Sequence, residues 1–340
     1  MTDTIVPITT KKDWMSDQEV RWCPGCGDYG IMHALQQLMP DLGVAPENTV
    51  FISGIGCSSR FPYYMNTYGM HSIHGRAPAI ATGVAVARPD LDVWVITGDG
   101  DGLSIGGNHL IHALRRNVNL TILLFNNRIY GLTKGQYSPT SEIGKVTKST
   151  PFGSVDTPFN PLSVAIGAEA SFVARTHDLD RKHMIEVFRA AHAHQGASFV
   201  EIFQNCNVFN DGTFEDITSK NARDEMMIDL THGEPIRFGV DGHRGIVMGG
   251  DGQLRTVEVD DVGVDALLVH DAHREDPGLA FALARLSHDD HSATPFGVFR
   301  SVERGDYGAM VAAQLADASA KKGPADLLDL LRGNGTWLVD

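Results

Sequence analysis

The sequence is short of positive charge and of long apolar runs. Its 340 residues include 28 Lys and Arg against 42 Asp and Glu, a formal net charge of −14, so we expect no nucleic-acid-binding surface. No apolar run approaches the ~18 residues that a membrane span needs. The N-terminus also lacks the cationic start and apolar stretch of a secretion signal. These absences predict a cytoplasmic protein without a membrane segment.

Cysteine is scarce as well, and glycine is plentiful. Four cysteines are too few for a disulfide-built scaffold, and in a reducing compartment they are metal ligands, reactive thiols or core residues. The 36 glycines indicate tight turns and loops whose backbone can approach a phosphate group.

Between about residues 25 and 205, helical periodicity alternates with short apolar runs that end in glycine. This pattern is typical of an α/β fold, a mostly parallel sheet with helices on both faces. We expect strands at 49–52, 92–97, 120–125, 171–175 and 198–203, and helices at 30–39, 77–88, 107–116 and 179–194. The Ser/Thr/Pro-rich segment 140–160 is expected to be irregular. We divide the chain into a cofactor-binding domain, 1–210, and a smaller extension of hairpins and helices, 211–340.

Two polar residues follow neighbouring strands of this predicted sheet. Asp99 stands between two glycines after the strand at 92–97, and Asn127 follows the next strand. Ligands bind at the carboxyl ends of such strands, so both oxygens are expected in one cleft. Mg²⁺ prefers such oxygen ligands, and the glycines allow backbone N–H groups to approach a diphosphate. The alternative is that Gly-Asp-Gly is a plain turn and Asn127 a helix cap.

The cysteines suggest a second site. Cys23 and Cys26 form a C-x₂-C pair, whereas Cys57 and Cys206 stand alone, so a four-cysteine centre must be assembled by folding. An isolated cysteine is often only a small buried hydrophobic residue. Zinc favours four thiolates but its ribbons use two close pairs, whereas iron–sulfur clusters accept irregular spacing.

Several motifs occur together in a fixed order. They are Cys-Pro-Gly-Cys-Gly from 23, Gly-Cys-Ser-Ser from 56, His-Ser-Ile-His-Gly-Arg-Ala from 71, Gly-Asp-Gly-Asp from 98, Asn-Asn from 126 and Tyr-Gly-Leu-Thr-Lys-Gly-Gln from 130. Over roughly residues 15–220 the chain resembles the β subunit of the 2-oxoacid:ferredoxin oxidoreductases, which have a thiamine-diphosphate-binding fold. Segment 204–210 and the long tail resemble the 2-oxoglutarate branch, with a pyruvate or other 2-oxoacid enzyme as the alternative.

The resemblance implies specific site residues. Asp99, the Asn127 side chain and the Ile129 carbonyl would hold Mg²⁺, and the thiamine diphosphate would contact Ile55, Gly56, Ser58, His74, Gly98, Asp99, Gly100, Asp101, Asn127, Ile129, Gly131, Leu132 and Thr133. One [4Fe–4S] cluster would be held by Cys23, Cys26, Cys57 and Cys206. The resemblance also places His74 near the cofactor, where it would bond the diphosphate or developing charge on the substrate. Arg60 and Lys134, basic positions in that family, are expected at the cleft mouth, where two cations suit the carboxylates of a dicarboxylate substrate.

The same resemblance implies a reaction and its partners. The reaction is oxidative decarboxylation of 2-oxoglutarate with coenzyme A to succinyl-CoA and CO₂, with electrons passed to ferredoxin, and it can run in reverse. Thiamine activation needs a carboxylate from a second domain, and residues after 210 have no βα pattern to form one. An α subunit is therefore expected, in a dimer of αβ pairs.

Two functions of other classes remain open from the residues alone. A non-redox thiamine decarboxylase or synthase would use Asp99 and Asn127 but leave the four cysteines idle. A zinc-stabilised binding module would use the cysteines but leave the predicted magnesium ligands idle.

Overall fold

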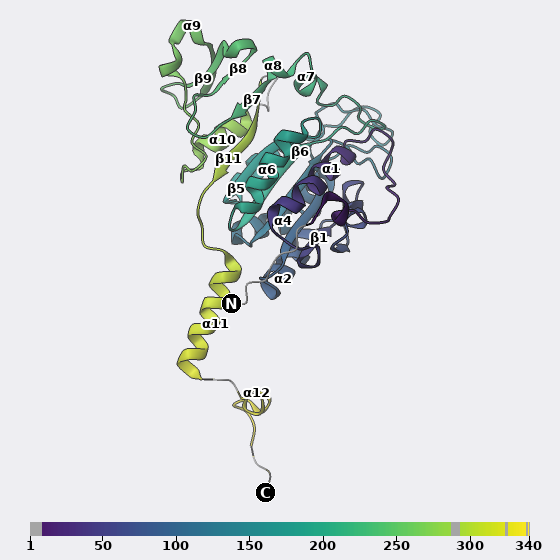
Figure 1. Cartoon of the computed structure of the whole chain (residues 1–340), viewed down its shortest axis with the longest axis vertical. Coiled ribbons are helices and arrows are strands. Elements are labelled where there is room, and N and C mark those ends of the chain that lie inside the picture. Colours follow the sequence, from purple (N-terminus) through teal and green to yellow (C-terminus); the bar gives the residue numbers. More distant parts are fainter. Residues whose placement is uncertain (1–8, 287–292, 324–325, 338, 340) are drawn as a thin grey trace.

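An eight-stranded sheet forms the centre of the molecule (Figure 1). The computed structural model describes residues 9–286, 293–323, 326–337 and 339. The strands lie in the order β2 (Tyr68–His71), β1 (Thr49–Ser53), β3 (Asp92–Gly98), β4 (Leu120–Asn126), β6 (Ala197–Phe203), β5 (Phe172–His177), β11 (Thr294–Ser301) and β7 (Met227–Leu230). Neighbouring strands are parallel except β5 and β11. The predicted mostly parallel α/β fold is confirmed.

Helices cover both faces of this sheet because its strands are apolar on both sides. In β3, Val95 packs into the core on one face, and Trp94 and Ile96 pack into the core on the other. The first face is covered by α2 (Ala77–Ala87), α4 (Gly107–Arg116), α5 (Pro161–Gly167) and α10 (Gly278–Arg285). The second is covered by α1 (Asp28–Leu38) and α6 (Arg181–Ala193).

Local sequence explains where the predicted elements begin and end. The Asp180 side chain accepts a hydrogen bond from the His183 backbone N–H and so caps the start of α6. Met184 and Phe188, one turn apart on the same side of that helix, are buried. Segment 98–102 differs from the expected loop, since its residues from Asp99 form a short helix, α3 (Asp99–Leu103). The sequence also gave no signal for β2, whose residues are exposed at the sheet edge.

The part of the chain after residue 210 contributes to two sheets. β7 and β11 join the central sheet, whereas β8 (Arg237–Phe238), β9 (Arg244–Met248) and β10 (Leu254–Glu258) form an antiparallel sheet of three strands. The expected hairpins are those joining β8 to β9 and β9 to β10. Short helices α7 (Glu215–Thr218), α8 (Arg223–Met226) and α9 (Val259–Val262) complete this part. The division into two domains at residue 210 stays a prediction.

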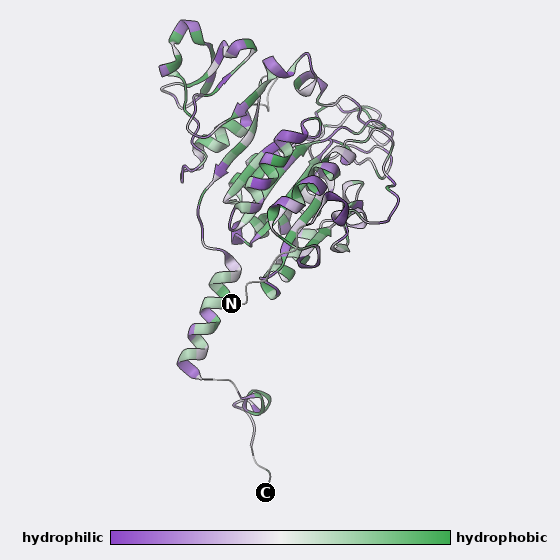
Figure 2. Cartoon of the chain, in the orientation of Figure 1, coloured by the Kyte–Doolittle hydropathy of each residue, from purple (hydrophilic) through white to green (hydrophobic). Residues whose placement is uncertain are grey.

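Two helices extend away from the rest of the molecule. α11 (Tyr307–Lys322) and α12 (Leu327–Arg332) reach out from the end of β11, and they contain no buried residue (Figure 1). Apolar positions nevertheless recur along both helices (Figure 2). Leu330 and Leu331 of α12 are each more than two-thirds exposed. Across the described ranges, we find no helix with the length and apolar character that crossing a membrane requires.

The sheet topology sets where a ligand can bind. The chain places β2 on one side of β1 and β3 on the other, so the strand order reverses at β1. In open parallel sheets, such a reversal leaves a crevice at the carboxyl ends of the strands.

Candidate functional site

A cleft lies at this reversal, between the loops that follow β1, β3 and β4. It is lined by Ile55, Gly56, Cys57, Ser58, His74, Gly98, Asp99, Gly100, Asp101, Phe125, Asn127, Ile129, Tyr130, Gly131, Leu132 and Thr133. The lining includes each residue expected to contact the thiamine diphosphate. Folding thus brings together five of the six sequence motifs.

Asp99 is a buried carboxylate in the wall of this cleft. Its Oδ2 atom accepts hydrogen bonds from Ser138 Oγ at 2.5 Å and Thr140 Oγ1 at 2.6 Å. Burial raises the pKa of Asp99 to about 6, although both hydroxyls favour the charged form. The two hydroxyls come from the irregular segment after β4, whose partners the sequence did not reveal. We infer that this segment fixes the orientation of Asp99.

The Asn127 side chain is held from two sides. Its Oδ1 accepts the Ile129 backbone N–H at 3.1 Å, and its Nδ2 donates to Gln204 Oε1 at 2.8 Å. Gln204 faces Asn127 because β4 and β6 pair in register, with Asn126 opposite Phe203 at their ends.

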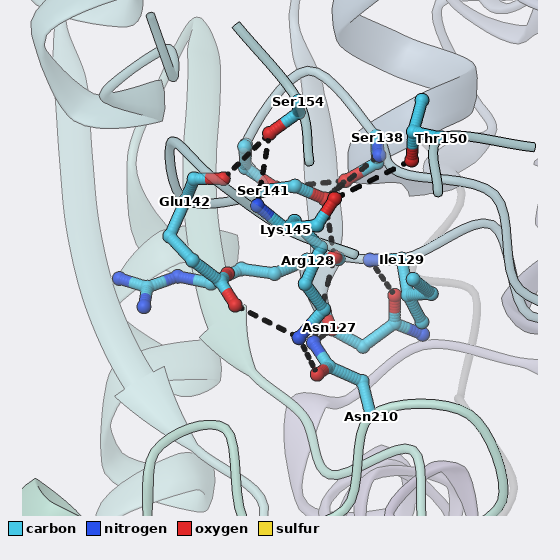
Figure 3. A network of polar contacts seen from close by, with 11 residues as sticks. Asn127, Arg128, Ile129, Ser138, Ser141, Glu142, Lys145, Thr150, Ser154 and Asn210 are labelled. Carbon is cyan, nitrogen blue, oxygen red and sulfur yellow. Dashed lines mark hydrogen bonds and ion pairs between the residues drawn. The ribbon is translucent and has the colours of Figure 1, made fainter. Parts of the chain in front are cut away.

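The backbone of Asn127 and Arg128 is held by a further polar network (Figure 3). Asn210 Nδ2 donates to the Asn127 carbonyl at 2.9 Å, and Ser141 Oγ donates to the Arg128 carbonyl at 2.6 Å. Lys145 Nζ lies 2.5 Å from Asn210 Oδ1 and so connects the irregular segment to the loop after β6. The network makes the loop after β4 a rigid wall of the cleft.

Asp101 joins three loops around the cleft. Its Oδ1 accepts the backbone N–H groups of Ile55 at 3.0 Å and Gly75 at 2.8 Å, and its Oδ2 accepts the Thr97 hydroxyl at 2.7 Å. His74 Nδ1 also lies 3.0 Å from Asp101 Oδ1. Because these three donors hold its carboxylate, Asp101 fixes the shape of the cleft and lies beside His74.

Two glycines of the cleft wall lie close to other side chains, and at Gly100 the packing leaves no room for a Cβ atom. A Cβ atom on Gly100 would lie 2.2 Å from the Tyr130 ring, whose hydroxyl donates to the Gly100 carbonyl. A Cβ atom on Gly131 would lie 3.4 Å from Cys206 Sγ and 3.6 Å from Cys57 Sγ. Gly131 thus lies in the cleft wall and also against two of the four cysteines.

The first two cysteines lie on a tight turn. Gly25 has φ of +83°, which favours glycine, and the Cys26 backbone N–H donates to the Cys23 carbonyl at 3.0 Å. Gly27 is needed because a Cβ atom there would lie 1.8 Å from Asp178 Oδ2. The glycines of Cys-Pro-Gly-Cys-Gly therefore shape the turn.

The thiols of Cys26 and Cys57 are mostly buried. Burial, followed by the nearby Asp28 carboxylate, raises the pKa of Cys26 and raises the pKa of Cys57 to about 12. Within the ranges that the structure describes, no group of three or more His, Cys, Asp or Glu side chains is arranged to hold a metal ion as it stands. The cysteine cluster ligands and the magnesium ligands therefore stay predictions.

The two cations assigned to the substrate do not line the cleft. Arg60 Nε donates to Tyr64 Oη at 3.1 Å, in the 3₁₀ helix that follows Cys57. Lys134 is an exposed residue with φ of +76° in the turn after Gly131. Their roles at the substrate stay predictions.

Sequence reasoning missed several residues of the site. Ser138, Thr140 and Tyr130 contact predicted site residues, and Gln204 connects Asn127 to Cys26. The Ser/Thr content of the segment after β4 was the only available signal for the first two.

The fold and the cleft define a thiamine pyrophosphate-binding α/β domain. The family described as "Thiamine pyrophosphate enzyme, C-terminal TPP binding domain" matches residues 54–202, which include the strands and loops around the cleft. A subunit named KorB is similar to the chain over nearly its whole length, and the chain therefore belongs to the family of 2-oxoglutarate oxidoreductase β subunits. This assignment confirms the resemblance seen in the sequence motifs.

The family assignment rests on similarity along nearly the whole chain. The 2-oxoglutarate oxidoreductase subunit KorB of Mycobacterium tuberculosis is 60% identical over 341 residues, 98% of this chain and 91% of that protein. The 2-oxoglutarate synthase subunit KorB of Methanocaldococcus jannaschii is 40% identical over 188 residues, 55% of this chain and 70% of that one.

A solved structure is also similar to nearly the whole chain. It is the 2-oxoglutarate:ferredoxin oxidoreductase from Magnetococcus marinus with 2-oxoglutarate, coenzyme A and succinyl-CoA bound. The TM-score is 0.75 at 34% sequence identity, and the similarity covers 95% of each chain.

Proposed function

We propose that this chain is the thiamine-binding and electron-carrying subunit of a CoA-linked 2-oxoglutarate:ferredoxin oxidoreductase. The observation that carries the proposal is the position of Gly131. It belongs to the wall of the cleft that contains Asp99 and Asn127, and it also packs near the sulfur atoms of Cys57 and Cys206. Two cofactors bound at these sites would be neighbours.

The cleft residues fit a magnesium diphosphate. Asp99, the Asn127 amide and the Ile129 carbonyl offer hard oxygen ligands in one wall, which is the chemistry that Mg²⁺ prefers. Ser58 and the Gly131–Thr133 segment lie around the same space, where backbone and hydroxyl groups can bind a diphosphate. We propose that His74, positioned by Asp101, contacts the diphosphate or the reacting substrate.

The cysteines fit one iron–sulfur cluster. The Sγ atoms of Cys57 and Cys206 both lie beside Gly131. Besides burial, Cys206 and Cys57 raise the pKa of Cys26, and Cys206 and Cys23 raise the pKa of Cys57, so the thiols are close neighbours. We propose that they converge with Cys23 around a [4Fe–4S] cluster, which would replace the protons that burial holds on the thiols.

When bound, thiamine diphosphate supplies the electron sink for decarboxylation of a 2-oxoacid, and the cluster supplies the route for single electrons to ferredoxin. The protein positions the diphosphate through Asp99 and Asn127. We propose that Arg60 and Lys134 attract the carboxylates of 2-oxoglutarate. An α subunit is proposed to supply the carboxylate that activates thiamine, in a dimer of αβ pairs that takes coenzyme A as co-substrate and acts in the cytoplasm.

The test is anaerobic co-purification of the chain with its α subunit. We expect thiamine diphosphate, magnesium, iron and sulfide in the complex, and release of CO₂ from 2-oxoglutarate that depends on coenzyme A and ferredoxin. The chain purified alone serves as the control and is expected to be inactive. A complex that contains zinc and no thiamine would refute the proposal, and faster turnover of pyruvate would refute the choice of substrate.

A further inference from the structure

Gln204 is in direct contact with both proposed cofactor sites. It follows the last residue of β6, and only 1% of its surface is exposed. Its Oε1 accepts a hydrogen bond from Asn127 Nδ2 at 2.8 Å, and its Nε2 donates to Cys26 Sγ at 3.3 Å. A single amide thus connects a proposed magnesium ligand to a proposed cluster ligand.

The orientation of this amide is fixed from both ends. The Ile129 backbone N–H can only donate, so Asn127 Oδ1 must face it and Asn127 Nδ2 must face Gln204. At the other end, the Asn205 carbonyl can only accept, and it lies 2.6 Å from Gln204 Nε2. Both constraints orient the Gln204 side-chain amide with its oxygen toward Asn127 and its nitrogen toward Cys26.

The hydrogen-bonding capacity of the Gln204 amide is well used. One N–H hydrogen is directed to the Asn205 carbonyl and the other to Cys26 Sγ, while the oxygen accepts from Asn127. A buried amide with three partners has no low-energy alternative orientation, because any rotation would leave a buried donor or acceptor unsatisfied. Gln204 therefore holds Asn127 and Cys26 in a fixed relationship.

We propose that Gln204 is a positioning residue that couples the two sites. Through Asn127 it orients the amide oxygen for Mg²⁺, and its N–H group raises the midpoint potential of the cluster at Cys26. A hydrogen bond to a ligating sulfur stabilises the more negative, reduced cluster, and such partners also set the orientation of metal ligands. This inference rests on the proposed function, since it takes both cofactor sites as assigned.

The main test is Gln204→Met in the anaerobic αβ complex. Methionine keeps the length of the side chain but provides neither the N–H donor nor the oxygen. We expect a lower midpoint potential in a redox titration monitored by electron paramagnetic resonance. We also expect thiamine diphosphate to bind about 10-fold more weakly, as when a partner of a metal ligand is removed.

Two further variants separate the possible effects. Gln204→Glu keeps an oxygen acceptor for Asn127 but places a carboxylate against the sulfur, so we expect nearly unchanged thiamine affinity and a lower potential. Asn205→Ala is the matched control, because among the described residues its side chain bonds Asp211 and the Gly212 backbone and neither proposed cofactor site. We expect both quantities to stay at their wild-type values in this control.

The outcomes distinguish the inference from the function on which it rests. A wild-type complex without cluster or thiamine refutes the proposed function, whatever the variants do. A wild-type complex with both cofactors, and a Gln204→Met complex with full iron content and unchanged potential, overturns the inference. If the Gln204→Met complex loses its cluster, the midpoint potential is measured in the Gln204→Glu complex instead. A potential equal to that of the wild type in Gln204→Glu would also overturn the inference.

Discussion

The indole nitrogen of Trp22 donates a hydrogen bond of 2.7 Å to the carbonyl oxygen of Cys57. This contact joins the turn that begins at Cys23 to the loop after β1. Trp22 is nearly buried and packs edge-on against Tyr64, with 4.8 Å between the ring centroids. The relative position of two of the proposed cluster ligands is thus fixed by a neighbouring aromatic side chain.

We expect Trp22→Phe to weaken the retention of the cluster. Phenylalanine keeps most of the aromatic packing but loses the N–H donor, which costs about 1 kcal/mol. The measurement is the rate of iron loss to a chelator under anaerobic conditions. Trp14→Phe is the control, since buried Trp14 donates to Thr9, away from the cysteines. Equal rates in the two variants would contradict a specific role for Trp22.

Asp99→Asn is expected to abolish binding of thiamine diphosphate. The change removes the negative charge from a magnesium ligand while keeping an acceptor for Ser138 and Thr140. Asparagine suits this position better than alanine, because Asp99 is buried, at 2% exposure, and its two hydroxyl partners need an acceptor. Cofactor content of the purified complex is the measurement. Ser138→Ala, which keeps the charge, should bind the cofactor with weakened affinity, and unchanged content in Asp99→Asn would refute the ligand assignment.

Cys206→Ser separates electron transfer from the chemistry at carbon. A hydroxyl is a poorer ligand for iron than a thiolate, so we expect the cluster to be weakened or lost. The diphosphate residues Asp99 and Asn127 are untouched. The variant complex should therefore bind thiamine diphosphate and release CO₂ slowly without reducing ferredoxin. Ferredoxin reduction at the wild-type rate by a complex shown to lack the cluster would exclude this chain as the electron carrier.

Arg60→Ala tests the choice of substrate. If Arg60 binds the distal carboxylate of 2-oxoglutarate, loss of a charge-assisted hydrogen bond should lower kcat/KM for that substrate about 10-fold or more. Pyruvate has no distal carboxylate, so its kcat/KM should change much less. Arg60→Lys, which keeps the charge, provides the comparison. An equal decrease for both substrates would show that Arg60 has another role.

The stability of the chain should depend on pH through His177. This side chain is 4% exposed beside Phe296, and burial lowers the pKa of His177 to about 4. In the unfolded chain the pKa is about 6.5, so the unfolded state takes up the proton first as the pH falls. Stability is therefore lost between pH 6.5 and 4, by up to about 3 kcal/mol.

His177→Leu removes the titrating imidazole and replaces it with an apolar side chain of similar size. The melting temperature of the variant should fall less between pH 7.5 and pH 5 than that of the wild type. Burial raises the pKa of Asp178 to about 6, so this carboxyl group makes the folded protein more stable as the pH falls, opposite to His177. Because Asp178 is present in both proteins, its effect cancels in the comparison. Parallel falls in melting temperature would show that His177 does not titrate in this range.

Strand ends and their motifs could be predicted because their signals are local. Gly-Asp-Gly after an apolar run and the glycines around Cys26 mark positions with little room for side chains, and the structure shows such close contacts at Gly100, Gly25 and Gly27. The unbroken apolar run of β3 is also a local signal, because the period of the strand directs its buried side chains alternately to the two faces of the sheet.

The contacts that complete the site depend on distant parts of the chain and have no local signal. Ser138 and Thr140 lie in an irregular segment, so nothing in their spacing shows that they reach Asp99. Gln204 was notable only within a motif, and its contact with Asn127 depends on the register of β4 against β6. For the same reason, the antiparallel insertion of β11 between β5 and β7 could not be seen in the sequence.

The absence of a side chain at Gly131 has a consequence for the speed of the redox reaction. Electron tunnelling slows exponentially as the gap between donor and acceptor widens, and even one methyl group at this position would lie against the sulfur atoms of Cys206 and Cys57. In the proposed holoenzyme, only backbone would insulate the thiamine from the cluster at this point. A side chain larger than a methyl group there would need the space between the two proposed sites, and displacement of either cofactor by it would lengthen the tunnelling distance.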